Sequence, residues 1–184
     1  MRVRILSRGI LAAAAVTMLT AGAIRAQGPA GPPRPGPEHR KLDYFAGRWT
    51  YEMEMKAGPL GPAGKARGTD HCEWFDGGFH MLCRGEGKGS MGELKGLGIL
   101  SYDAEEGAYT YYGIDNTGTA ELSKGSLAGD TWTYAGEFKV SGKVLKSRYS
   151  VRMLPPDEYT SRWEVSTDGG PWITVMEGKD VRLK

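Results

Sequence analysis

The 184-residue chain contains two cysteines, Cys72 and Cys83, which flank the turn sequence Asp76-Gly77-Gly78-Phe79. A hairpin that turns at Gly77-Gly78 pairs residues whose numbers sum to 155, so the two cysteines lie directly opposite each other. Opposed residues bring their Cβ atoms within about 4.5–5.5 Å, close to the ~3.8 Å that a disulfide requires. We therefore predict a structural disulfide; the alternative is two free buried thiols. A redox-catalytic pair is not expected, because the chain has no C-x-x-C motif.

The same hairpin carries three further candidates for chemistry, His71, Glu73 and His80, which share one face. Three such ligands could hold a catalytic zinc. In this register, however, His80 lies opposite Phe75, four residues along from His71, which is about 13 Å of strand at ~3.3 Å per residue. Two imidazoles so far apart cannot share a metal. We predict no metal site, and a surface ion pair between Glu73 and His80, which are diagonal neighbours.

Motifs for other chemistries do not occur in the chain: there is no G-x-S-x-G sequence, no P-loop and no dinucleotide-binding glycine pattern. The acidic residues fall mainly on alternating polar positions, which is typical of a solvated face. We therefore predict no catalytic residue and no cofactor. Carboxylates paired inside a barrel would leave no local motif, so an enzyme of that kind stays open as an alternative.

The elements that position these residues are predicted to be β-strands. A short helical segment around Leu42 and Phe45 ends at Gly47, and period-2 alternation of apolar and polar residues follows to the C-terminus. Turn sequences rich in Gly, Asp, Asn and Pro separate about ten such runs, a spacing typical of an up-and-down sandwich or barrel. The large apolar residues that alternate are Trp49, Tyr51, Met53 and Met55; Trp132, Tyr134 and Phe138; Tyr149, Val151 and Met153; and Tyr159, Trp163 and Val165.

The apolar face is rich in Trp, Tyr, Phe and Met and poorer in Val, Ile and Leu. Such residues can form a packed core, or they can line an adaptable apolar cavity. Composition alone leaves both open. If a cavity exists, the alternation points six side chains inward as candidate ligand contacts: Met53, Trp74, Met81, Tyr134, Tyr149 and Trp163.

The sequence Gly47-Arg48-Trp49, after a short helix and at the start of the first strand, resembles the Gly-x-Trp start of lipocalins and other calycins. The resemblance implies that Trp49 closes one end of a barrel and that a late basic residue, here Arg182, stacks over it. Nearly all of 39–184 also resembles a bacterial family of secreted calycin-like domains of unknown function, which implies a closed antiparallel barrel of about ten strands. The matching motifs are His39-x-x-Leu42, Gly47-x-Trp49, Phe75-Asp76-Gly77-Gly78-Phe79, Gly96-Leu97-Gly98, Ser101-Tyr102-Asp103, Tyr109, Asp115, Gly118 and Ser166-x-Asp168-Gly169-Gly170-x-Trp172.

Haem is a ligand of one calycin branch, the nitrobindin-like barrels, which also begin with Gly-x-Trp. That branch takes its iron ligand from a histidine in the C-terminal part. This chain has no histidine after His80, so the resemblance does not extend to haem.

The N-terminal 26 residues have the pattern of a secretory signal peptide. Three arginines precede an uncharged, mostly apolar run at 9–23, and small residues lead to a cut after Ala26 or, alternatively, after Ala23. The run is shorter than the ~20 residues of a spanning helix, and no cysteine near the cut could carry a lipid. We predict a signal peptide at 1–26, a Pro/Gly-rich tether at 27–37 and one domain at 38–184, in the periplasm or outside the cell.

Cleavage at Ala26 would remove four arginines and no acid, so 24 basic residues fall to 20 against 22 acidic ones. The formal net charge of the whole chain, +2, then becomes −2, and no basic patch indicates a nucleic-acid partner. We predict an exported monomeric barrel that binds a small apolar molecule. The alternatives are a solid-core barrel that binds a protein or cell-envelope partner through its outer surface or tether, and a carboxylate-based enzyme.

Overall fold

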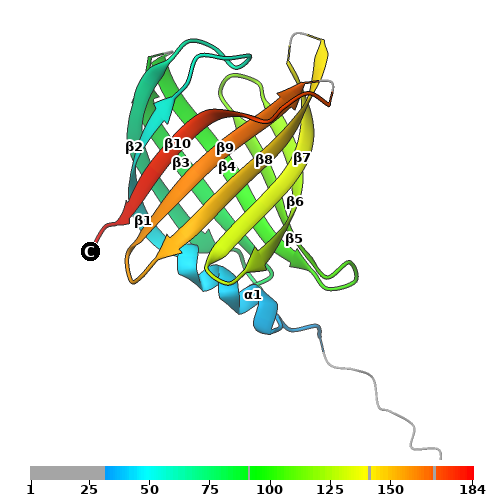
Figure 1. Ribbon diagram of the computed structural model, residues 1–184. Helices are drawn as coiled ribbons and strands as arrows, with labels where there is room; N and C mark the ends of the chain where they lie inside the picture. Colours follow the sequence, from blue (N-terminus) through cyan, green and yellow to red (C-terminus); the bar gives the residue numbers. More distant parts are fainter. Residues whose placement is uncertain (1–31, 91, 141, 168) are drawn as a thin grey trace, which may run out of the picture. The chain divides into compact units, whose positions relative to one another are not determined.

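Ten antiparallel strands follow one another along the chain and close into a barrel in the computed structural model (Figure 1). The structure describes residues 32–90, 92–140, 142–167 and 169–184; the predicted signal peptide lies outside these ranges, and 34–184 form one unit. The strands are β1 (Gly47–Met55), β2 (Gly64–Trp74), β3 (His80–Gly89), β4 (Gly92–Asp103), β5 (Ala108–Asp115), β6 (Ala120–Ala128), β7 (Thr131–Val140), β8 (Lys143–Leu154), β9 (Glu158–Thr167) and β10 (Ile173–Arg182).

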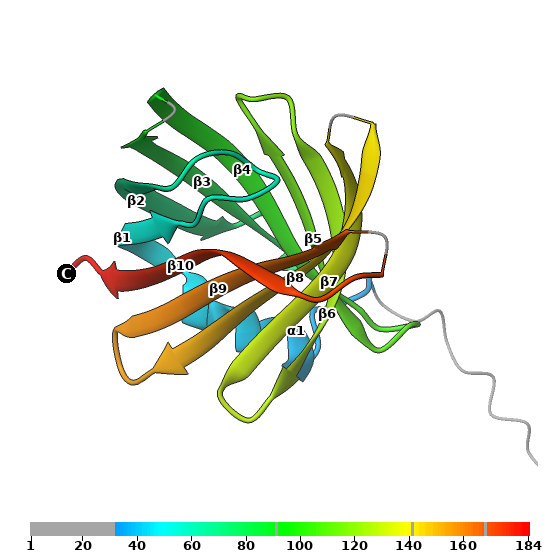
Figure 2. The same ribbon diagram turned by 45° about the horizontal axis from the view of Figure 1, so that its top comes forward.

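Each strand pairs with the next along the chain, and β1 also pairs with β10, which closes the sheet. This is the up-and-down barrel of ten strands that the alternation and the calycin resemblance predicted, and the structure confirms it. Closure leaves no free sheet edge. In Figure 2 the end of the barrel opposite to the helix is turned toward the viewer, and the strands form a ring around the interior.

A short helical segment lies across the other end, as predicted. It consists of α1 (Pro37–Lys41) and a 3₁₀ turn at Leu42–Phe45 (Figure 1). Proline fits the first helical position, where its missing N–H would have had no partner. Leu42 and Phe45 are 0% and 6% exposed, so the segment closes the barrel with apolar side chains.

An aromatic core packs beneath this segment. The rings of Tyr109 and Trp132 have centroids 4.4 Å apart, and those of Trp49 and Tyr159 are 4.9 Å apart. The indole N–H of Trp49 donates to the carbonyl oxygen of Phe45 at 2.9 Å, which ties the first strand to the helical segment. This half of the barrel is therefore a packed core.

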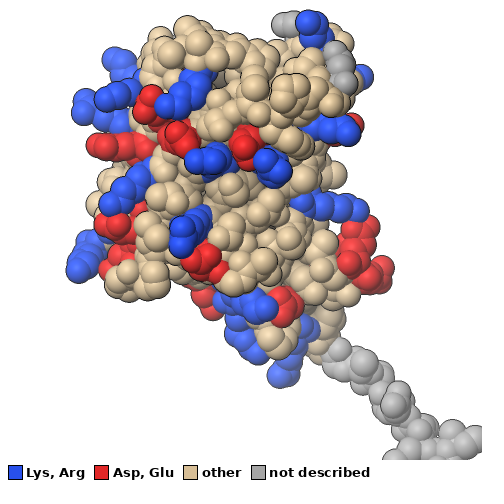
Figure 3. Space-filling model, viewed as in Figure 1, with Lys and Arg blue, Asp and Glu red and all other residues tan. Residues whose placement is uncertain are grey.

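The outer face carries interspersed basic and acidic side chains (Figure 3). Cross-strand ion pairs such as Arg162–Glu177, at 2.8 Å, are exposed and contribute little stability each. The prediction of a Glu73–His80 ion pair was wrong: Glu73 pairs instead with Arg84 at 3.0 Å, because the long guanidinium of Arg84 reaches the carboxylate from the other diagonal position.

Among the residues that the structure describes, no three His, Cys, Asp or Glu side chains gather as they would around a metal ion. The described helices are all too short or too polar to cross a membrane.

Candidate ligand-binding cavity

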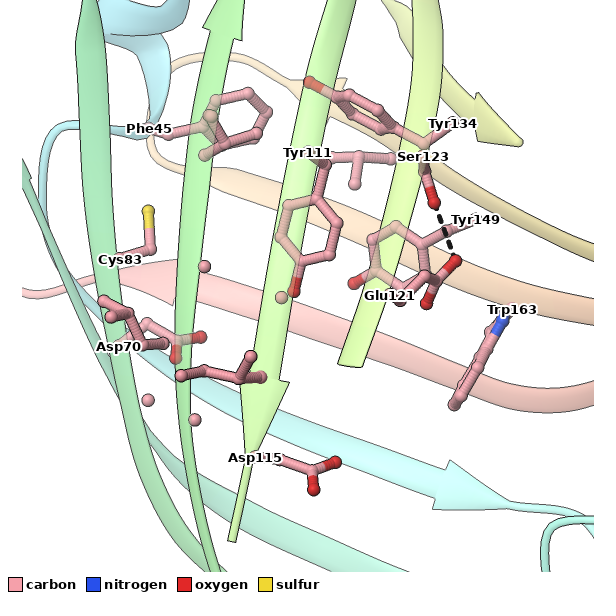
Figure 4. Close-up of a pocket in the computed structure, with 18 of the residues that line it drawn as sticks. Phe45, Asp70, Cys83, Tyr111, Asp115, Glu121, Ser123, Tyr134, Tyr149 and Trp163 are labelled. Atoms are coloured by element: carbon pink, nitrogen blue, oxygen red, sulfur yellow. Dashed lines mark hydrogen bonds between the residues drawn. The ribbon is translucent and has the colours of Figure 1, made fainter. Parts of the chain in front are cut away.

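The barrel interior between the aromatic core and the far end is hollow. It contains a cavity of about 370 Å³, within the ~300–1,000 Å³ range of small-molecule sites. The cavity extends from Phe45 of the helical segment to Asp115 and Thr119 near the β5–β6 turn, and most of its exposed wall is apolar. Figure 4 shows the labelled side chains around it. The interior is thus a packed core at one end and a cavity at the other.

Part of the cavity wall consists of glycines, which have no side chains of their own. Gly85, Gly96, Gly98 and Gly113 line the cavity from β3, β4 and β5. The ring of Tyr111 lies against two of them: a Cβ atom would stand 2.8 Å from its ring at Gly98 and 2.4 Å from its hydroxyl oxygen at Gly113. At Gly85 a Cβ atom would stand 2.5 Å from Oδ1 of Asp70. These glycines therefore make room for side chains that enter the interior from neighbouring positions.

The sequence contained a signal for this wall. Glycines recur with the period of a strand, at Gly85, Gly87 and Gly89 and again at Gly96 and Gly98, so each set lies on one face. Glycine served only as a turn signal in the sequence reasoning. A run of period-2 glycines on the inner face indicates a wall without side chains of its own, against which large side chains such as Tyr111 can lie.

Four of the six candidate ligand contacts line the cavity: Met53, Tyr134, Tyr149 and Trp163. The other two lie elsewhere. Met81 is 0% exposed in the aromatic core. The indole N–H of Trp74 donates to Asp43 at 2.7 Å, which fixes this side chain next to the helical segment.

The Cys72–Cys83 disulfide is present, with the two cysteines directly paired between β2 and β3. This confirms the register derived from the turn at Gly77-Gly78. Both cysteines also line the cavity, so the bridge holds together part of its wall.

Arg182 lies over Trp49, its guanidinium carbon 4.1 Å from the centroid of the indole ring. The same guanidinium donates to the carbonyl oxygens of Tyr44 and Ala46. These contacts join the last strand, the first strand and the helical segment at the closed end, away from the cavity.

Two inward carboxylates were missed by the sequence reasoning. Asp70 lines the cavity from β2, and Asp180 is 1% exposed on β10. They flank β1, since Asp70 is paired with Trp49 and Asp180 with Tyr51. Alternation could have found both, because Asp70 is two residues from Cys72 and Asp180 is two residues from Arg182. Asp70 therefore shares a strand face with Cys72, and Asp180 shares one with Arg182, which was expected to stack over Trp49.

Burial raises the pKa of both carboxyl groups. The pKa of Asp70 rises to about 6. That of Asp180 rises to about 7: burial is the largest cause, the hydroxyl of Tyr159 partly offsets it, and the charge of Asp70 raises it further. Within the described part of the chain, no cation or hydrogen-bond donor lowers the pKa of Asp70.

Two further acids lie toward the far end of the cavity. Glu121 accepts a hydrogen bond from the hydroxyl of Ser123 at 2.7 Å (Figure 4). Asp115 accepts from the backbone N–H groups of Thr117 and Thr119 at 2.8 and 3.1 Å, so it caps the β5–β6 turn. Burial raises the pKa of Asp115, but these hydrogen bonds outweigh it and hold the pKa below its ordinary value.

Several buried polar atoms inside the barrel have no hydrogen-bond partner among the described residues. They include the hydroxyl of Tyr134, the hydroxyl of Ser161 and Oδ2 of Asp180. Tyr134 is 4% exposed and lines the cavity. Buried polar groups are nearly always paired in native proteins, so an unpaired hydroxyl at a cavity wall indicates a place where a bound molecule can donate or accept.

Comparison with known proteins gives a family and a fold. The model of the family described as "Protein of unknown function (DUF1579)" matches residues 34–182. No curated protein matches the sequence. The crystal structure of Rv2717c from M. tuberculosis superposes with a TM-score of 0.60 at 15% identity, over 81% of this chain and 99% of that one. The S-type phycobiliprotein lyase CPES from Guillardia theta superposes with a TM-score of 0.55 at 12% identity, over 80% of this chain and 93% of that one.

Proposed function

The chain belongs to the DUF1579 family of proteins of unknown function, and we propose that it binds a small, largely apolar molecule inside its barrel, outside the cytoplasm. The observation that carries the proposal is the cavity of about 370 Å³ beside a fully packed aromatic core. Protein interiors are normally close-packed. A barrel that packs rings together at one end and leaves a cavity of this size next to them has room for a small molecule.

The wall supports an apolar body for the ligand. Tyr111, Tyr149, Tyr159 and Trp163 contribute aromatic surface from three different strands. Rings of this kind contribute large contact area and stack against planar or apolar groups. The Rv2717c structure and the phycobiliprotein lyase share the fold, but a fold does not determine a function, so the proposal rests on the cavity.

Export is the second part of the proposal. It is supported by the signal-like pattern at 1–26 and by the Cys72–Cys83 disulfide, since disulfides persist mainly in oxidising compartments.

Native mass spectrometry of the protein purified from its own host tests the binding function. We expect a retained small molecule in the wild-type protein. Met53→Trp adds bulk to the cavity wall from β1, so this variant should lose the molecule. Glu52→Trp is the matched control, because position 52 is exposed and faces outward on the same strand. Wild-type protein without any retained molecule, or equal retention by both variants, would contradict the proposal.

A carboxylate-based enzyme is the second candidate, and the raised pKa values of Asp70 and Asp180 favour it. General acid–base catalysis needs both groups to reach the substrate, whereas only Asp70 lines the cavity. Incubation of the retained molecule with fresh protein separates the two functions. A mass that changes with wild-type protein but not with Asp70→Asn would establish an enzyme; an unchanged mass supports a binding protein.

A further inference from the structure

The charged groups of the cavity all have one sign. Its wall contains three carboxylates, Asp70, Asp115 and Glu121, and no lysine or arginine among the described residues. Asp115 is engaged in capping a turn, and Glu121 accepts from Ser123. Asp70 has neither kind of partner. In Figure 4 it lies on one side of the cavity and Glu121 on the other, with the rings of Tyr111 and Tyr149 between them.

Asp180 is a second buried carboxyl group close to Asp70. It is 1% exposed, lies across β1 from Asp70 and has an unpaired Oδ2. Two neighbouring carboxyl groups with no basic partner in the described part of the chain are unfavourable in a folded interior. A cation supplied by a ligand would remove this penalty at the place where the wall opens onto Asp70.

The aromatic wall also suits a cation. The rings of Tyr111, Tyr134, Tyr149 and Trp163 line the same cavity, and organic cations bind over aromatic faces with about 0.5–2 kcal/mol each. The unpaired hydroxyl of Tyr134 is an independent sign of a polar ligand group, because it is buried and has no partner among the described residues.

We propose that the ligand is a small organic amine, whose ammonium group pairs with Asp70 and whose apolar body packs against the tyrosine rings. This assignment rests on the proposed binding function and specifies the chemical class of the ligand. Neutral molecules would leave the carboxylates unpaired, and carboxylate-bearing molecules would be repelled by them.

Binding should depend on pH, since the amine needs Asp70 ionised. The raised pKa of Asp70, about 6, means that the carboxyl binds a proton in acid. The amine then has to displace this proton, so its affinity falls below pH 6. The other titratable groups around Asp70 are tyrosines, which stay neutral in this range, and one carboxyl group: Tyr51 on β1, Tyr111 on β5, Tyr149 on β8, Tyr159 on β9 and Asp180 on β10.

Three probes of similar size and different charge test the assignment: 2-phenylethylamine, 2-phenylethanol and 3-phenylpropanoate. Calorimetric titration of the full protein at pH 8 should give at least about tenfold tighter binding of the amine than of the alcohol, and the weakest binding of the carboxylate. Asp70→Asn, which keeps the size of the side chain, should reduce the preference for the amine to less than about threefold. Glu52→Gln is the matched control, because Glu52 is exposed and faces outward on the neighbouring strand β1, so this variant should retain the preference.

Each outcome distinguishes the amine assignment from the binding function. Equal affinity of wild-type protein for the amine and the alcohol, or a preference for the carboxylate, would overturn the amine assignment and leave the binding function standing. Absence of binding by all three probes overturns it too. The binding function is tested separately by native mass spectrometry: it fails if the protein from its own host retains no molecule, or if Met53→Trp and Glu52→Trp retain it equally. The wild-type comparison needs no variant, so it stands even if Asp70→Asn fails to fold.

Discussion

The guanidinium of Arg182 lies 4.1 Å above the ring of Trp49 and donates through Nη2 to the carbonyl oxygen of Tyr44 at 2.7 Å. Its Nε is 3.2 Å from a carboxylate oxygen of Asp157. With its further bond to the carbonyl oxygen of Ala46, one planar group therefore contacts an aromatic face, two backbone carbonyl groups and an acid. Lysine cannot reproduce this, because its ammonium has no planar fork.

Arg182→Lys should accordingly lower the free energy of unfolding by about 1–3 kcal/mol, measured by urea denaturation. Arg162→Lys is the control: Arg162 pairs with Glu177 on the exposed outer face, so its loss should cost less than about 1 kcal/mol. Equal costs for the two substitutions would show that the stacking of Arg182 on Trp49 adds no stability.

The disulfide should stabilise the barrel by lowering the conformational entropy of the unfolded chain. It joins residues separated by 11 positions, and closing a loop of that length removes about 2–3 kcal/mol of unfolded-state entropy. We expect Cys72→Ala/Cys83→Ala to unfold at a lower urea concentration than the oxidised wild type. Reductant should destabilise the wild type and leave the double variant unchanged. Two alkylatable thiols in native protein without reductant would contradict the bridge.

Asp180 should make the protein less stable as the pH rises. Its pKa in the folded protein, about 7, lies above the ordinary value of 3.8. The folded state therefore binds the proton more tightly than the unfolded state. The stabilisation is fully present below pH 3.8 and is lost as the pH rises through 7. Asp180→Asn should raise the free energy of unfolding at pH 8 by a few kcal/mol and change it much less at pH 5.

The difference in unfolding free energy between wild type and Asp180→Asn, taken at each pH, isolates the contribution of Asp180 from the opposite contribution of His39. Burial lowers the pKa of the His39 imidazole, so its contribution to stability is present above its ordinary pKa and is lost in acid. That contribution is common to both proteins and cancels in the difference. A difference that does not vary between pH 5 and pH 8 would contradict the raised pKa of Asp180.

The glycine wall predicts a strong coupling between Gly98 and Tyr111. In most strand positions alanine stabilises relative to glycine, but a Cβ at Gly98 would stand 2.8 Å from the Tyr111 ring. Gly98→Ala should therefore cost about 1–3 kcal/mol by overpacking. In a Tyr111→Leu background the same change should cost little, which gives a coupling energy of at least about 1 kcal/mol in a double-mutant cycle. Additive effects would show that the ring of Tyr111 does not depend on the glycine.

The sequence by itself determined the local parts of this protein. Period-2 alternation predicted the strands and the inward side chains, and one turn at Gly77-Gly78 determined the register that pairs Cys72 with Cys83. These properties depend only on residues close together in the chain, because side chains alternate strictly along a strand. The inward direction of Tyr134, Tyr149 and Trp163 followed from the same rule.

Only the tertiary structure decided where the interior is full and where it is empty. Alternation assigned Met81 and Tyr134 alike to the inside, and both belong to the buried core, but only Tyr134 also lines the cavity. Closure of the sheet brings β2 and β10 to either side of β1, so Asp70 and Asp180 become neighbours although they are far apart in the sequence. Periodicity is a local property of each strand. The volume that the ten strands enclose depends on how the first strand pairs with the last. The same pairing decides which charged groups lie near that volume.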